Sequence, residues 1–171
     1  HGLLRFDNIF GTGAGQIPSG ASVTSARLLL RTDNWGNDIR LHRMQVTWSG
    51  SSTWNNVGSV NDGVSTTAGD AVTTPELTFA TIAVASIVNL DVAASVRFWA
   101  TNGGPNYGWA LVDSGDDGYQ FNSSEATDIT QRPQLIVTYA PSGATNPIVI
   151  VTQPAGSTTV NWTFNTVNMT V

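Results

Sequence analysis

The chain has 171 residues, of which 40% are hydrophobic and only 11% charged, so Ser, Thr, Asn and Gly must cover much of its surface. All seven basic residues are arginine and the net charge is -5, which excludes the basic stripe that nucleic-acid binding needs. Cysteine is absent, which excludes a disulfide framework and a thiolate metal site, and the length allows one main domain.

Short apolar or alternating segments, separated by Gly, Pro, Asn, Asp and Ser, predict a succession of strands. Strands are expected at residues 3–6, 22–31, 39–48, 77–82, 87–90, 109–112, 119–122 and 133–139. A short helix is expected from about Val92 to Trp99, because apolar residues there recur three or four positions apart. This pattern predicts an all-β fold, an antiparallel β-sandwich of jelly-roll type with at most one short helix.

Two strand segments make finer predictions. Within 22–31, the expected core residues are Val23, Ala26, Leu28 and Leu30, and a turn is expected at 33–37. Within 39–48, alternate residues face opposite sides of the sheet, and the pattern leaves open whether the same side is buried along the whole strand or switches partway.

The C-terminal end differs in composition from the rest. Residues 1–140 are predicted to form the sandwich, 141–147 a linker rich in Pro, Ser and Gly, and 148–171 a C-terminal strand extension. Two strands are expected there, at 148–152 and 158–171, and a hairpin so apolar needs a partner sheet. The candidate assembly residues are Ile148, Ile150, Val160, Trp162, Phe164, Val167 and Met169.

An ordered series of short motifs runs from about residue 3 to Tyr139. The motifs are Leu3-Leu4-Arg5-Phe6-Asp7, Ile17 to Ala21 with Val23 to Leu28, Val46-Thr47-Trp48 with Ser52 to Asn56, Leu90-Asp91-Val92 with Phe98-Trp99, Tyr107 to Leu111, and Phe121 to Glu125 with Arg132 to Leu135. This series resembles the DNRLRE domain family of secreted bacterial and archaeal proteins. The resemblance implies a β-sandwich module of a large exported protein, often beside polysaccharide-degrading or other hydrolase domains. Some relatives are carbohydrate-binding modules for alginate-like polymers.

The chain departs from that family at both ends. The family usually places one or more strands before the LLRFD-like motif, so the resemblance implies a vacant position in the sheet. Residues 147–171 lie outside the match and are expected to fill such a position, in a neighbouring copy or in their own chain. Head-to-tail exchange between copies that does not close makes a filament. The alternative is that this segment begins a second β-domain.

The candidate chemical groups are few. With only His1 and His42 as bases and no cysteine, no nucleophile and base pair can be drawn, and the chain is predicted not to be an enzyme. Asp113, Asp116 and Asp117 in a Gly-containing turn are candidate Ca²⁺ ligands, although an acidic hairpin turn is the simpler explanation. Trp35 is the candidate sugar-binding platform, because the resemblance places Trp48, Trp54 and Trp99 among structural positions.

These observations predict a non-catalytic structural or adhesive module of the cell surface or extracellular space, with no membrane span. Its expected partners are copies of itself, joined into a filament by donor-strand exchange, or neighbouring domains of a larger exported protein. The alternative is a carbohydrate-binding module that tethers a polysaccharide-active enzyme to its substrate.

Overall fold

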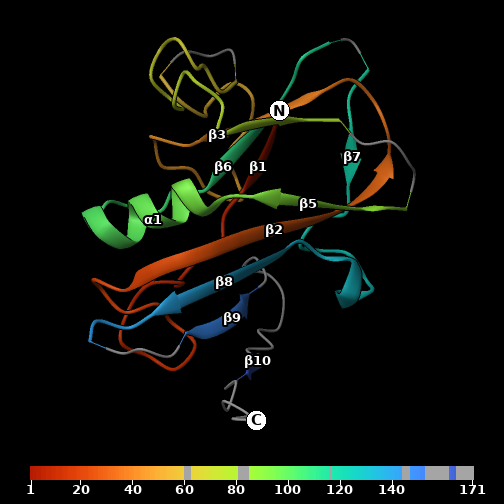
Figure 1. Ribbon diagram of the computed structural model, residues 1–171. Helices are drawn as coiled ribbons and strands as arrows, with labels where there is room; N and C mark the ends of the chain where they lie inside the picture. Colours follow the sequence, from red (N-terminus) through yellow and green to blue (C-terminus); the bar gives the residue numbers. More distant parts are fainter. Residues whose placement is uncertain (60–62, 81–84, 116, 144–146, 153–161, 165–171) are drawn as a thin grey trace. The chain divides into compact units, whose positions relative to one another are not determined.

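The computed structural model describes residues 1–59, 63–80, 85–115, 117–143, 147–152 and 162–164. The described chain is mostly β, with two antiparallel sheets and one α-helix (Figure 1), which confirms the predicted all-β, sandwich-like class. It divides into two compact units. The first unit comprises His1–Arg5, Thr32–Ser86 and Pro105–Phe121, and the second comprises Phe6–Arg31, Ile87–Gly104 and Asn122–Val171.

The first unit contains a four-stranded sheet in the order β1-β6-β3-β4. Its strands are β1 (Gly2–Leu4), β3 (Ile39–Arg43), β4 (Leu77–Phe79) and β6 (Trp109–Asp113). A short strand, β7 (Gln120–Phe121), pairs with the end of β2 (Ser22–Asn34) at Thr32 and Asn34. Because β7 supplies hydrogen-bonding partners there, β2 continues to Asn34, and the turn predicted from residue 33 begins later.

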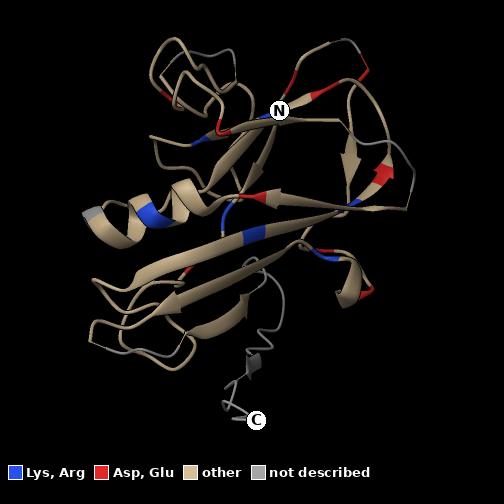
Figure 2. Cartoon of the chain, in the orientation of Figure 1, with Lys and Arg blue, Asp and Glu red and all other residues tan. Residues whose placement is uncertain are grey.

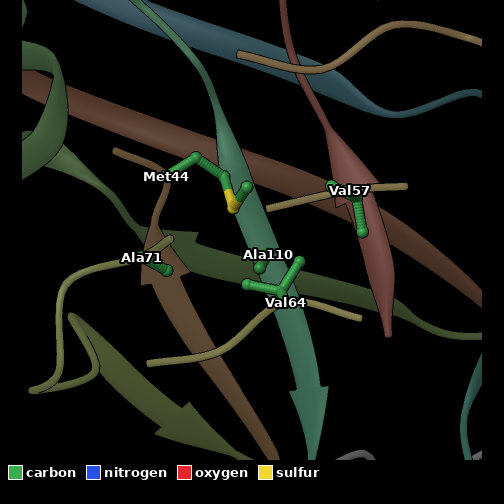
Figure 3. Close-up of a cluster of buried hydrophobic side chains, with 5 residues drawn as sticks. All are labelled: Met44, Val57, Val64, Ala71 and Ala110. Atoms are coloured by element: carbon green, nitrogen blue, oxygen red, sulfur yellow. The ribbon is translucent and has the colours of Figure 1, made fainter. Parts of the chain in front are cut away.

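The strand predicted at 39–48 is shorter than expected and ends at Arg43. Beyond it, the Met44 amide donates to the Gly108 carbonyl at 2.9 Å and the Gln45 amide donates to the Asp70 carbonyl at 2.8 Å. The buried side switches from Ile39 and Leu41 to His42 and Met44, which settles a point that the sequence left open. Met44 thereby joins a core cluster with Val57, Val64, Ala71 and Ala110 (Figure 3).

The second unit is built on strands in the order β10-β9-β8-β2-β5, and β7 is a sixth strand of this sheet through its pairing with the end of β2. Its strands are β2 (Ser22–Asn34), β5 (Ile87–Asp91), β8 (Gln134–Ala140), β9 (Ile148–Thr152) and β10 (Trp162–Phe164). The four core residues predicted on β2 are all buried. A register shift between Val23 and Ser25 explains why Val23 and Ala26, three residues apart, are both buried.

The predicted helix follows β5 as expected and is α1 (Ala93–Asn102), which ends at Gly103 in the left-handed conformation. Its Val96 and Trp99 side chains are buried. Arg97 ties it to β2, because its guanidinium donates to the carbonyls of Val23 and Thr24 at 2.9 Å each. A single 3-10 turn, η1 (Ile129–Gln131), precedes β8. Across the described chain, no helix has the length and apolar character needed to cross a membrane.

Candidate functional site

The C-terminal segment lies at one edge of the second unit's sheet. β9 pairs antiparallel with β8 over five residues, from Tyr139 opposite Ile148 to Leu135 opposite Thr152. Ile150 is 3% exposed and is therefore a core residue, whereas Ile148 is half-buried. In the described part of this segment, β9 thus pairs with the sheet of its own chain, which is one of the two arrangements predicted.

The remaining candidate assembly residues are placed only in part. β10 pairs with β9, with Trp162 opposite Val151 and Phe164 opposite Val149. Val160, Val167 and Met169 lie outside the described residues.

The first unit contains a pocket of about 260 Å³ that was not predicted from the sequence. Two indole rings and several hydroxyl groups border it, in the segment that follows β3. The lining residues are His1, Leu3, Trp48, Ser49, Gly50, Ser52, Thr53, Trp54, Val57, Gly63 and Val64. The only local sequence signal was a pair of tryptophans six residues apart around a Ser- and Gly-rich loop.

Trp48 forms a fixed wall of this pocket. Its indole N–H donates to the Tyr107 carbonyl at 2.7 Å. Arg5 holds it a second time, because the guanidinium donates to the Trp48 carbonyl at 2.9 Å and lies 4.9 Å from the ring centroid. A ring that is held in this way loses little conformational freedom when a ligand packs against it.

Trp54 is the exposed wall. Its side chain is 53% exposed, and its ring centroid lies 4.8 Å from that of His1. The His1 ring is held in turn, since its Nδ1 accepts the Val64 amide at 3.2 Å. Trp54 is therefore not a core residue, in contrast to the structural position that the resemblance implied, while Trp99 is buried as expected.

A buried carboxylate binds the backbone close in sequence to two of the lining residues, Val57 and Val64. Asp70 is fully buried, and its two oxygens accept the backbone amides of Ser59 at 2.8 Å and Ser65 at 3.0 Å. The bonded serines are close in sequence to Val57 and Val64, which belong to the core cluster (Figure 3). Asp70 thus shapes the pocket without lining it.

The pocket is lined by indole rings, hydroxyl groups and apolar side chains. Comparisons with protein-family models, with curated proteins and with solved structures gave no match. The site is therefore interpreted from its own residues. Flat indole faces accept the apolar faces of a ligand, and the hydroxyls of Ser49, Ser52 and Thr53 offer hydrogen bonds. Among the described lining residues, His1 is the only one with a titratable side chain, so no carboxylate pair for hydrolysis is assembled there.

The predicted sugar platform lies elsewhere in the first unit. Trp35 follows the end of β2 and is 58% exposed. It is accessible to a ligand, but it does not line the pocket. Its role in sugar binding stays a prediction.

The predicted Ca²⁺ ligands lie in the turn after β6. The Asp113 carboxylate accepts the Gly115 amide at 3.1 Å. The backbone of Asp117 makes two hydrogen bonds with Asn37. The Asn37 amide donates to the Asp117 carbonyl at 2.6 Å, and the Asp117 amide donates to the Asn37 side-chain oxygen at 2.7 Å. Asp116 lies outside the described residues, and in the described part no three ligating side chains gather. Calcium stays a prediction.

Two further titratable groups, His42 and Asp128, make hydrogen bonds within the fold. His42 is buried on β3, and its Nδ1 lies 2.8 Å from the Val72 carbonyl oxygen. Asp128 caps η1: hydrogen bonds to its carboxylate, first from the Thr130 hydroxyl and then from the Thr130 amide, lower its pKa.

Proposed function

We propose that this chain is a non-catalytic structural or adhesive module of the cell exterior, joined to copies of itself through its C-terminal strands. The observation that carries the proposal is the addition of β9 to the β8 edge after the linker 141–147. Strand addition to a sheet edge is a general mode of assembly, because backbone hydrogen bonds give affinity and alternate side chains give specificity.

The β8 edge needs a covering strand. Leu135, Val137 and Tyr139 of β8 are buried. Neither β8 nor β9 carries a charged side chain, and both strands are drawn in tan in Figure 2. An apolar edge without charges or prolines templates aggregation when it is left open. A β9 strand must therefore occupy it, and a copy's β9 has the same sequence and fits equally well.

The test is electron microscopy and light scattering of the purified chain beside a variant that lacks residues 147–171. We expect polymers from the whole chain and none from the truncated one. A synthetic peptide of residues 147–171 should bind the truncated chain and raise its melting temperature, which shows that the shortened chain still folds. A whole chain that stays monomeric at high concentration contradicts the proposal.

A second candidate function is carbohydrate binding, which the pocket between Trp48 and Trp54 supports. Sugar rings have apolar faces that stack on indole, and their hydroxyls pair with Ser and Thr side chains. The pocket supplies both kinds of group, with one indole fixed and one exposed. The resemblance to modules beside polysaccharide-degrading domains agrees with this candidate.

Affinity electrophoresis in gels containing alginate, pectin or cellulose tests the second candidate. Retardation that Trp54→Ala reduces and Trp35→Ala leaves unchanged assigns binding to the pocket. The reverse pattern assigns it to the Trp35 platform. Migration unaffected by any of the three polymers contradicts carbohydrate binding for these ligands.

A further inference from the structure

We infer that the element exchanged between copies is β9 itself, and that Gly143 is the hinge. The hinge decides whether β9 pairs with β8 of its own chain or with β8 of another copy. This inference rests on the proposed assembly function. In the exchanged form, β9 takes its present register on the β8 strand of the next copy. The partner is a second copy of this chain, and its binding surface is the β8 edge from Leu135 to Tyr139.

The sheet topology makes β9 separable. Within the sheet, β9 is paired with β8 and β10 alone, and β2 remains on the opposite side of β8 when β9 leaves. Exchange removes Ile150 from the core of one copy and buries it in the core of another. The strand pairing is the same in both forms, so the balance between them depends on protein concentration and on the connection between the strands.

The connection from β8 to β9 begins with a hydrogen-bonded residue, Ser142, followed by a glycine with a positive φ, Gly143. The Ser142 hydroxyl donates to the Gly20 carbonyl at 2.9 Å, which ties the chain to the second unit just after β8. The next residue, Gly143, has a φ of +79°, in the left-handed region that side chains disfavour. Gly143 has this conformation in the form in which β9 pairs with β8 of the same chain.

The space around Gly143 allows a direct test of the hinge. A Cβ added there meets no atom within 4 Å, so Gly143→Ala penalises the left-handed conformation without a steric clash. An exchanged chain can pass this position in an extended conformation and avoids the penalty. We expect Gly143→Ala to raise the ratio of polymer to monomer by roughly tenfold, the effect of disfavouring one left-handed residue.

The first unit offers a matched control. Gly69 has a φ of +91°, and a Cβ there also meets no atom within 4 Å. Gly69→Ala carries the same kind of backbone strain at a site remote in sequence from the linker. It should lower stability and leave the ratio of polymer to monomer unchanged. Equal ratios for the two variants would overturn the role of Gly143.

Cross-linking tests which element is exchanged. The chain has no cysteine, so every disulfide that forms must join engineered cysteines. Thr138 on β8 and Val149 on β9 are register partners, and both are half-buried. Chains carrying Thr138→Cys are mixed and refolded with chains carrying Val149→Cys, and are then oxidised. Exchange of β9 predicts disulfide-linked heterodimers well in excess of homodimers.

The control pair lies within the sheet before the linker. Leu29 on β2 and Gln134 on β8 are also register partners, and mixed Leu29→Cys and Gln134→Cys chains should give no such excess. Suppose that polymers form and that the mixed Thr138 and Val149 variants give no heterodimer excess. The inference about β9 then fails, while assembly through other residues of the segment stands. Absence of polymers contradicts the proposed assembly itself.

Discussion

Asp70→Asn is the substitution that best tests how the first unit is held together. The change keeps the shape of the side chain but replaces one carboxylate oxygen by an NH₂ group, which cannot accept the amide of Ser59 or Ser65. One charge-assisted hydrogen bond is lost and the other becomes neutral, while removal of a buried charge offsets part of this loss. Hydrogen bonds to charged groups contribute about 1.5–3 kcal/mol each, so we expect about 1–3 kcal/mol of destabilisation.

The measurement is urea unfolding followed by tryptophan fluorescence, together with amide hydrogen exchange at Ser59 and Ser65. Asp113→Asn is the matched control, because that carboxylate also accepts a backbone amide but in an exposed turn. Its effect should stay within about 0.5 kcal/mol. If Asp70→Asn has as small an effect and both serine amides keep their protection, the assigned role of Asp70 is wrong.

Two further predictions concern the second unit. Because Ile150 is buried, Ile150→Ala should lower the free energy of unfolding in urea titrations by about 2–3 kcal/mol. Val149 is only half-buried, so Val149→Ala should lower it by less than about 1 kcal/mol. Equal effects would place β9 away from the core. Burial raises the pKa of Tyr139 above the usual 10.0, so its contribution to stability is complete below that pH and is lost as the pH rises through the folded-state pKa. The free energy of unfolding should therefore fall more steeply above about pH 10 for the wild type than for Tyr139→Phe, and parallel titrations would refute this.

Much of the secondary structure followed from local patterns in the sequence. Alternation of apolar residues identified the strands that became β2, β8 and β9, and the change to a spacing of three and four identified α1. These patterns are readable because a strand or helix buries one face whatever its partner is. The core residues of β2 could be named for the same reason.

The pocket could not be predicted from the sequence, because its residues meet only through long-range interactions. Trp48 is fixed by Arg5 and Tyr107, which are 43 and 59 positions away in the sequence. Trp54 lies in a polar loop, and whether its ring is buried depends on contacts that the loop sequence does not specify; the structure leaves it 53% exposed. Asp70 lies in a polar loop and carries no sequence signal of its burial, which arises when the amides of Ser59 and Ser65 converge on it.

The C-terminal segment shows most plainly what the sequence determines and what the tertiary structure determines. By itself, the sequence determined that residues 148–152 form a strand whose apolar faces need a partner sheet, since alternation and hydrophobicity are properties of the segment. Tertiary structure alone decided that the partner is β8, in a register that buries Ile150 and leaves Val149 half-buried. That choice depends on which sheet edge is open and on how the chain turns at Gly143, and neither is encoded within the strand.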